Sequence, residues 1–341
     1  MREDLATPHL SLRQLQVFCS VALAGSTAAA GEAIALSQSA TSAALLELER
    51  ALGLALFERI GKRLALNDNG RALLVQARAL LDGALSIERW AQDREGQVGR
   101  LRIGASTTIG NYLLPLFVAS LRGNLPAASR DGLNLQVTIA NTETIVRQVA
   151  DFELDVGLIE GPCHNDDLLV RAWLEDELLV VASPSDPILP RPPRGRIGMQ
   201  ALRQATWLLR EHGSGTREVI NQLLTPHLQQ LRAGIEFGDS EAIKRATAQG
   251  LGISCLSRYV VEDFLRTGQL VAPRTRLPRL SRPFQVILHA RKQRTRGLEL
   301  MLDSLARWRP PGPNGSGRKA TAPGRRKARR AARTRPVRGP V

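Results

Sequence analysis

The chain has 341 residues, of which 43% are hydrophobic, and this length suits two or three compact units better than a single core. Its formal charge of +15 favours an anionic partner, either nucleic acid or a membrane surface. Three distant cysteines and five histidines show no spacing typical of a metal site. Because the sequence lacks a signal peptide and a membrane-spanning apolar run, we expect a cytoplasmic protein with no metal or other cofactor.

The positive charge is concentrated at the C-terminus. Residues 310–341 contain ten Lys and Arg residues and no acid, which leaves a formal charge of only +5 for the rest of the chain. Since this segment is rich in Pro and Gly and almost free of large apolar residues, we predict a disordered basic tail. The tail either adds salt-sensitive affinity for nucleic acid or is solvated without a specific role.

Residues 12–92 follow a helical pattern almost throughout. Gly25 ends a first amphipathic helix, Ser26 is a good N-cap for an alanine-rich second helix, and Ser37 is a good N-cap for a third. Two helices joined by a short turn, the second beginning with short polar side chains, form the arrangement of a helix-turn-helix. We expect this domain to occupy residues 10–67.

A long helix follows, capped by Asn67 or Asp68 and ending near Gln92. One apolar seam runs along it, formed by Leu73, Leu74, Ala77, Leu80, Leu81, Ala84 and Ile87. A seam of this length on a connecting helix favours pairing with the same helix of a second chain. We therefore predict a linker helix over 68–94 and a homodimer or homotetramer.

From Gly99 onward, short β-rich runs alternate with helical stretches, as in an open α/β sheet. The expected strands lie at 100–106, 133–141, 154–161, 176–183, 206–211, 233–239, 252–257 and 282–290, before a last helix that ends near Trp308. We predict two α/β lobes, lobe I over 95–182 completed by 281–309, and lobe II over 183–280. The chain should cross between them near Ala182–Pro184 and near Leu280–Pro283.

The run "LRQLQVFCSVALAGSTAAAGEAIALSQSATSAALLELERALGLALFERIGKRLALNDNGRALL" resembles the LysR-type transcriptional regulators. It contains the family's Gly-Ser before the second helix, Ser-Gln at the start of the third, Leu-Gly, Leu-Phe-x-Arg and a later Gly. The resemblance covers roughly residues 10–310. It implies an α + α/β fold: a winged helix-turn-helix, a linker helix and a two-lobed effector domain similar to periplasmic binding proteins.

Within the family, "IGASTTIGNYLLP", "REHGSGTRE" and "SEAIKRATAQGLGISCLSR" look like the branch that controls sulfur assimilation or carbon fixation. Three positions depart from the common pattern. Ala28 and Ala43 replace Thr and Arg or another polar residue, which removes potential phosphate or base contacts. Asn67 replaces Thr and is an equally good N-cap.

The third helix begins with side chains that bury little but can read DNA. Gln38 can pair with adenine N6 and N7, the Thr41 methyl can touch a thymine methyl, and serines can reach bases or phosphate. A following basic loop would form the wing on the adjacent backbone or minor groove. The simpler alternative is a capped, exposed helix that contacts nothing. The predicted DNA-binding residues are Ser26, Gln38, Ser39, Thr41, Ser42, Arg59, Lys62 and Arg63.

Three strand-to-helix turns resemble anion-binding sites, because backbone N–H groups of a helix N-terminus and side-chain hydroxyl groups lie together there. Each turn alone is more simply explained as helix capping. If the lobes face each other as in the resembling family, however, the turns converge on one cleft. Sulfate, sulfite, thiosulfate or a phosphorylated sugar acid would suit it. The predicted effector-binding residues are Ser106, Thr107, Thr108, Asn141, Thr142, Ser214, Gly215 and Thr216.

No motif indicates catalysis. "HGSGTR" is neither a P-loop nor a nucleophile elbow, and His212 beside Ser214 faces no evident acid. We interpret the chain as a non-enzymatic, sequence-specific regulator that binds double-stranded DNA and senses a small anion between two lobes. A solute-binding or transport component with the same lobes is the main alternative, but it does not explain residues 12–92. A membrane-surface protein attracted through the tail is a weaker one.

Overall fold

The computed structural model describes residues 9–61, 63–92, 99–125, 133–190 and 195–311. All the elements below belong to the compact unit Met1–Arg309. Apart from Pro310 and Pro311, the predicted basic tail lies outside the described residues. Among the helices described, none is both long enough and apolar enough to cross a membrane.

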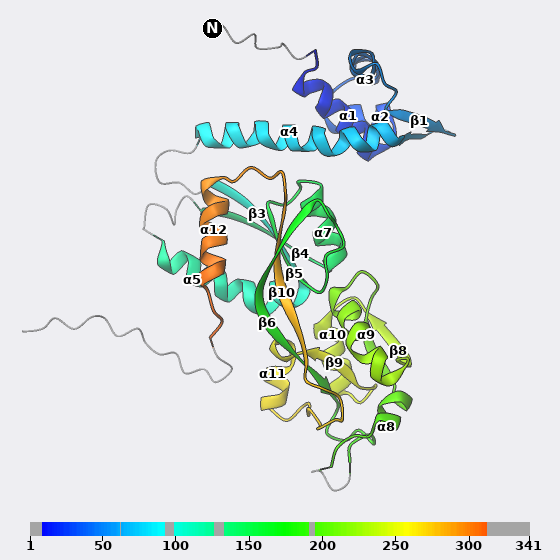
Figure 1. The fold of residues 1–341 in the computed structure, drawn as a ribbon, viewed down its shortest axis with the longest axis vertical. Helices are drawn as coiled ribbons and strands as arrows, with labels where there is room; N and C mark the ends of the chain where they lie inside the picture. The colour runs from blue at the N-terminus through cyan, green and yellow to red at the C-terminus, as the bar shows by residue number, and fades with distance from the viewer. Residues whose placement is uncertain (1–8, 62, 93–98, 126–132, 191–194, 312–341) are drawn as a thin grey trace, which may run out of the picture. The chain divides into compact units, whose positions relative to one another are not determined.

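The N-terminal domain consists of three helices and a hairpin (Figure 1). These elements are α1 (Leu12–Ala24), α2 (Thr27–Ala33), α3 (Gln38–Leu52), β1 (Phe57–Ile60) and β2 (Arg63–Leu66). The side chains of Ser26 and Ser37 accept hydrogen bonds from the backbone N–H groups of Ala29 and Ala40, so both predicted N-caps are present. Gly25 and Gly53 end α1 and α3 in the left-handed conformation, with φ of 68° and 66°.

The helices α2 and α3 approach each other closely at Gly31. A Cβ atom there would lie 2.6 Å from the Leu36 carbonyl oxygen and 2.8 Å from the Thr41 hydroxyl oxygen. Only a glycine therefore permits this crossing, which fixes how α3 is presented. Around it, Phe18, Leu48 and Leu56 are fully buried in the domain core.

The linker helix α4 (Asp68–Gln92) begins where the sequence predicts and is described as far as Gln92, and Asn67 accepts a hydrogen bond from Gly70 N at its start (2.9 Å). Its apolar seam is divided between two surroundings. Ala77 is fully buried, and Leu73, Leu74 and Leu81 pack partly against the N-terminal core. Leu80 and Ile87 of the seam are more than half exposed, and so is Leu85, which is not part of the predicted seam. The expectation that the whole seam serves a second chain is thus corrected, because about half of it is used within this chain.

Buried charges join α4 to lobe I. Asp82, 5% exposed, pairs with Lys292 (2.6 Å) and with Arg102 (3.4 Å), and both of these cations also pair with Asp155 (2.7 Å each). We call these four residues the Asp82 cluster. Burial acts to raise the pKa of Asp155, but the hydrogen bond from Arg102 and the charge of Lys292 outweigh it and lower that pKa to about 2. Asp155 therefore remains a carboxylate near neutral pH.

Six strands form the main sheet in the order β4-β3-β5-β10-β6-β9. They are β3 (Gly99–Ser106), β4 (Leu133–Ala140), β5 (Val156–Glu160), β6 (Leu168–Val181), β9 (Ser254–Ser257) and β10 (Leu280–His289). The strands β4, β3 and β5 are parallel, and β10 is antiparallel to both β5 and β6. Their limits agree closely with the predicted runs, except that β6 begins eight residues earlier than its predicted run.

Helices cover both faces of the sheet in lobe I. On one face, Ile103 and Ala105 of β3 pack with η1 (Ile109–Leu113), α5 (Leu114–Asn124) and α12 (Arg296–Arg307). On the other face, α7 (Thr142–Ala150) buries Ile145 and Val149. Gly104 faces Ile145, where a Cβ would lie 3.0 Å from the isoleucine side chain, so the glycine lets α7 lie against the sheet.

Lobe II is built around a shorter sheet. Its strands β7 (Trp207–Arg210) and β8 (Ala233–Phe237) are parallel, and Trp207 also forms a bridge with Ile253 next to β9. The helices are α8 (Met199–Gln204), α9 (Gly215–Leu228), α10 (Ser240–Ala248) and α11 (Arg258–Arg266). Trp207 and Leu209 lie in its core.

The lobes share the antiparallel strands β6 and β10. Leu174 of β6 packs in the core of lobe I, whereas Leu178 packs in the core of lobe II. The first crossing therefore lies inside β6, several residues before the expected Ala182–Pro184, because the strand runs through without a loop. The return passes between Leu280, in the lobe II core, and Phe284, in the lobe I core, within the expected span.

Gly31→Ala should lower the free energy of unfolding by about 1–3 kcal/mol, because its methyl group would be forced against the Leu36 carbonyl oxygen. Gly83→Ala is the matched control: this α4 glycine has open space around it, and alanine there should stabilise the helix by about 0.5–1 kcal/mol. Urea unfolding followed by circular dichroism measures both. A Gly31→Ala protein as stable as the parent would contradict the close crossing.

Candidate functional site

The predicted DNA-contacting residues occupy one end of α3 and the hairpin. Gln38, Ser39 and Ser42 are exposed on the first turns of α3, and Ser26 is half-buried as the N-cap of α2. Arg59 and Arg63 are exposed on β1 and β2, where Arg59 lies opposite Leu64 and Arg63 lies opposite Ile60. Lys62 lies outside the described residues. The structure thus brings basic and polar donors to the recognition helix and the wing.

Thr41 was expected to contact DNA, but the structure contradicts this. Its side chain is fully buried, and its hydroxyl donates a hydrogen bond to the Ser37 carbonyl oxygen (2.9 Å). It packs against Gly31 at the α2–α3 crossing. Thr41 therefore holds the two helices together, and its methyl group is not available to a base.

The predicted effector residues separate into three groups. The first group forms hydrogen bonds with Glu160 at the end of β5 and with Arg282 of the crossing strand β10. Ser106 Oγ accepts from Glu160 N (3.2 Å), Thr142 Oγ1 donates to the Glu160 carbonyl oxygen (2.9 Å), and Thr216 Oγ1 accepts from Arg282 Nη1 (2.8 Å). All three hydroxyls are buried. The expectation that Thr142 donates to an effector is corrected, because its O–H donates to Glu160, whereas Ser106 and Thr216 only accept in these contacts and stay predicted effector-binding residues.

Arg282, which the sequence analysis missed, is the centre of that network. Its guanidinium is 1% exposed and binds Glu160 Oε2 through Nη2 (2.7 Å) and Asp176 Oδ2 through Nε (2.9 Å). Ser257 donates to the other Asp176 oxygen (2.7 Å). Burial raises the pKa of Asp176, although the Arg282 charge beside it acts to lower it. The network ties both crossing strands to β5, β9 and α9.

The second group consists of Asn141, Ser214 and Gly215 at the starts of α7 and α9. Asn141 accepts from Thr144 N (3.0 Å) and Ser214 from Arg217 N (3.5 Å), so both are helix caps. Gly215 is a packing position, because a Cβ there would lie 1.6 Å from the Glu160 carbonyl oxygen. The backbone N–H of Glu143 also donates to Gly213 O (3.0 Å). The two lobes are therefore in tight contact at the starts of α7 and α9.

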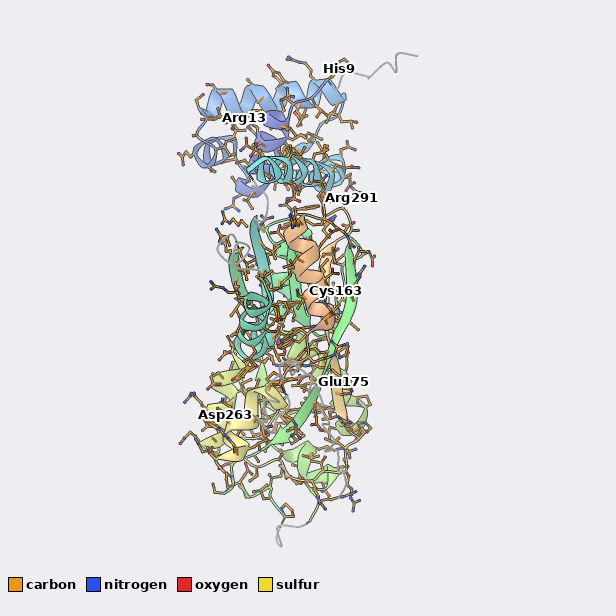
Figure 2. The ribbon with its side chains drawn as sticks, turned by 90° about the vertical axis from the view of Figure 1, so that its left-hand side faces the viewer. His9, Arg13, Cys163, Glu175, Asp263 and Arg291 are labelled. Carbon is orange, nitrogen blue, oxygen red and sulfur yellow. The ribbon has the colours of Figure 1, made fainter. Side chains whose placement is uncertain are left out.

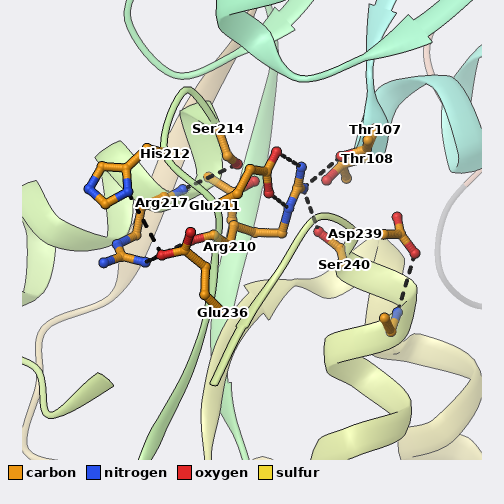
Figure 3. Close-up of polar contacts among 12 residues, drawn as sticks. Thr107, Thr108, Arg210, Glu211, His212, Ser214, Arg217, Glu236, Asp239 and Ser240 are labelled. Carbon is orange, nitrogen blue, oxygen red and sulfur yellow. Dashed lines mark hydrogen bonds and ion pairs between the residues drawn. The ribbon is translucent and has the colours of Figure 1, made fainter. Parts of the chain in front are cut away.

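A pocket of about 720 Å³ opens beside that contact, between α7 and α9. Thr142, Ser214 and Gly215 contribute to its wall, together with the charged side chains of Arg147 and Arg217. In the view of Figure 3, His212 and Arg217 lie on one side of Arg210, and Thr107 and Thr108 lie on the other.

The third group lies around Arg210, at the end of β7 (Figure 3). Arg210 Nη1 donates to Thr107 Oγ1 of lobe I (2.7 Å) and to Ser240 Oγ at the start of α10 (3.0 Å). Its Nε and Nη2 donate to the two carboxylate oxygens of Glu211, at 2.7 and 2.9 Å. We call Thr107, Thr108, Arg210, Glu211 and Ser240 the Arg210 cluster.

Two features mark this cluster as unusual. Arg210 is 1% exposed although it carries a full charge. The buried hydroxyl of Thr108 has no hydrogen-bond partner among the described residues, whereas its backbone N–H donates to Glu160 Oε1 (3.4 Å). A polar group left unsatisfied in a protein interior commonly marks a binding or strained site.

Arg210 and Ser240 were not among the predicted site residues. The available signals were a charged residue that ends the apolar strand "TWLLR" and the capping turn "GDSE", which resembles the three turns that were recognised. A second interlobe contact lies nearby, where Tyr112 of η1 donates to Glu241 Oε2 (2.5 Å). Burial and this hydrogen bond raise the pKa of Tyr112, so it stays a donor.

Glu241 is held in turn by Lys244, which is 2% exposed, at 2.8 Å. Asp263 of α11, labelled in Figure 2, binds the same ammonium at 3.0 Å. The charges at the start of α10 are therefore paired within lobe II, and Tyr112 adds the connection to lobe I.

Two family models match the chain. "Bacterial regulatory helix-turn-helix protein, lysR family" matches residues 12–71, and "LysR substrate binding domain" matches residues 94–309. An "Uncharacterized HTH-type transcriptional regulator YeiE" of Escherichia coli is 45% identical over 295 residues, which cover 86% of this chain and 97% of that protein. A "RuBisCO operon transcriptional regulator" of Allochromatium vinosum is 33% identical, covering 77% and 84%.

Solved structures agree on the fold. A full-length OxyR variant from Pseudomonas aeruginosa has a TM-score of 0.64 at 23% identity, covering 87% of this chain and 95% of that chain. The regulatory domain of Synechocystis CcmR in complex with 2-PG has a TM-score of 0.54 at 28% identity, covering 61% and 95%.

The predicted fold class is confirmed, and so is the resemblance to regulators of the carbon-fixation branch. The helix-turn-helix match sets aside the alternative of a solute-binding component. The chain belongs to the LysR family of bacterial transcriptional regulators, which are DNA-binding proteins with an effector-binding domain and not enzymes.

Proposed function

We propose that this regulator binds operator DNA through α3 and the hairpin, and that a small anionic effector at the Arg210 cluster modulates this binding. The observation that carries the proposal is Arg210 itself. A guanidinium that is 1% exposed reaches from lobe II to a lobe I hydroxyl, next to the buried Thr108 hydroxyl, which has no hydrogen-bond partner in the part of the chain that the structure describes. A buried charge in such a position is a strong candidate for ligand recognition.

The proposed DNA contacts are of two kinds, contacts to base edges and contacts to phosphate. Gln38, exposed at the start of α3, can pair with adenine in the major groove, and Ser39 and Ser42 can reach base edges or phosphate. Arg59 and Arg63 on the hairpin, with Lys62 between them in the sequence, supply phosphate contacts without reading sequence. Ser26 at the start of α2 is a further phosphate contact.

The effector class follows from the donors. Arg210 offers a guanidinium, and Thr107, Thr108 and Ser240 offer hydroxyl groups. This combination recognises the oxygens of a carboxylate, a sulfur oxyanion or a phosphate. Sulfate, sulfite, thiosulfate and a phosphorylated sugar acid belong to this class. The complex of the CcmR regulatory domain with 2-PG supports a small ligand in this kind of domain.

We propose further that the chain works in the cytoplasm as a homodimer or homotetramer, with residues 10–67, 68–94 and the two lobes as its functional domains. Leu80, Leu85 and Ile87 remain exposed on α4 by 51–63% after its other apolar residues have packed within the chain. Exposed leucine and isoleucine side chains on one connecting helix suit pairing with a second copy of that helix.

Gln38→Ala should relax the preference at one base pair of the operator, because it removes a base contact. Arg63→Ala should weaken binding to specific and random duplexes alike and reduce the slope of log K against log salt by about one unit. Fluorescence anisotropy at several salt concentrations measures both. Equal losses from Gln38→Ala on specific and random DNA would argue against base reading by this side chain.

The double variant Leu80→Glu/Ile87→Glu should dissociate the oligomer, since it puts two charges into an apolar contact. Leu251→Glu is the control, because Leu251 is 52% exposed in a turn outside α4. Sedimentation velocity gives the mass of each protein. The proposed interface is wrong if the double variant sediments like the parent.

Arg210→Lys should weaken binding of the effector anion about tenfold or more, because lysine keeps the charge but loses the planar fork, and a hydrogen bond to a charged group contributes about 1.5–3 kcal/mol. Arg147→Gln, in the wall of the α7–α9 pocket, should leave the affinity unchanged. Calorimetric titration with sulfate, sulfite, thiosulfate and 2-PG compares them. The opposite ranking would place the effector in that pocket.

A further inference from the structure

We infer that Glu211 is an internal competitor of the effector: its carboxylate occupies the edge of Arg210 that the anionic group of the effector takes, and the effector binds by replacing it. This inference rests on the proposed function, since it concerns the regulation of the same site.

The geometry of the pair carries the argument. Arg210 Nε and Nη2 donate to Oε2 and Oε1 of Glu211 at 2.7 and 2.9 Å, which is the two-pronged contact that guanidinium makes with a free carboxylate or oxyanion. The remaining nitrogen, Nη1, is used by Thr107 and Ser240. Both donors of the Nε/Nη2 edge are therefore used by Glu211, and both N–H groups of Nη1 are used by hydroxyl groups, so an anion can take two parallel hydrogen bonds from Nε and Nη2 only if Glu211 leaves.

Glu211 is the partner best able to leave. Among the described residues, it is the one acidic side chain that contacts the Arg210 guanidinium. An incoming anion therefore replaces one negatively charged group with another. Its side chain is 24% exposed, whereas the arginine is 1% exposed. The carboxylate can thus turn toward solvent while Arg210 stays in place.

The exchange limits which ligands can replace Glu211 beside Arg210. Leaving a buried guanidinium unpaired is costly, because the loss of its partner leaves an uncompensated charge. The ligand must therefore offer two oxygens to Nε and Nη2 at once, as a carboxylate, sulfate, sulfite or phosphate ester does. Chloride lacks this pair of oxygens and neutral sugars lack the negative charge, so neither displaces Glu211.

Displacement of the Glu211 carboxylate also affects a contact between the two lobes. Glu211 begins the segment 211–214 that joins β7 to α9, and its carbonyl oxygen accepts from Ser214 N (3.3 Å). Two residues further on, Gly213 O accepts from Glu143 N of lobe I (3.0 Å). Replacement of the Glu211 carboxylate therefore acts on the segment through which α9 touches α7.

Glu211→Gln tests the inference, because it removes the competing charge and keeps the shape of the side chain. Competition lowers the apparent affinity by the fraction of molecules in which Arg210 is free, so the dissociation constant of the full chain for sulfate, sulfite or 2-PG should fall about tenfold or more. Glu236→Gln is the matched control: this neighbouring glutamate pairs with Arg217 and does not contact the Arg210 side chain. Its constant should equal that of the parent.

A second measurement uses Glu211→Ala, which leaves a gap the size of a carboxylate beside Arg210. Acetate or formate should fill the gap and raise the Tm of this variant above the rise seen in the parent and in Glu236→Ala, because a ligand of the folded state stabilises it by mass action. An absence of this selective rise would count against the inference even if Glu211→Gln folded poorly.

The outcomes separate the inference from the function on which it rests. If Arg210→Lys loses the anion while Glu211→Gln binds it as the parent does, the effector site stands and the competitor role is wrong. An equal gain in Glu211→Gln and Glu236→Gln would reduce the effect to general electrostatics and also overturn it. If none of these anions binds the parent or Glu211→Gln, the proposed site fails together with the inference.

Discussion

The arrangement of the effector domain depends on the ion pairs of Arg282. One guanidinium, 1% exposed, holds Glu160 at the end of β5, Asp176 in the crossing strand β6 and the Thr216 hydroxyl of α9. Buried ion pairs add little net stability, but removing one partner is costly because the other charge is left uncompensated. The network therefore contributes specificity more than stability. Its ion pairs and hydrogen bonds form only when β6, β10 and the start of α9 take this arrangement.

A comparison of the two buried arginines shows why only one of them is a candidate for ligand binding. Arg282 binds two carboxylates that come from elements far apart in the sequence, and neither can leave without separating those elements. Arg210 binds the carboxylate of its own neighbour, whose side chain can move alone. Both charges are neutralised inside the protein, but only the second can exchange its partner while the fold is preserved.

Local signals in the sequence were sufficient to predict the helices and strands. They were insufficient to predict the side-chain contacts between these elements. Ser37, Gly25 and Gly53 act within one turn of their own helix, so their roles could be predicted from neighbouring residues. Thr41 lies on α3 beside exposed serines, and its burial depends on Gly31 of another helix. Likewise, the local sequence around Thr216 does not reveal its hydrogen-bond partner Arg282, which lies 66 residues away.

The Asp82 cluster gives the linker helix a mechanical property. Since buried charges fasten α4 to lobe I at Asp82, the helix moves with that lobe as a lever whose arm toward Asp68 is about 21 Å long, at 1.5 Å per residue. A rotation of about 5° at the cluster displaces the far end by about 2 Å. In a dimer, two such levers would change the spacing of the recognition helices, a distance that DNA fixes by its helical repeat.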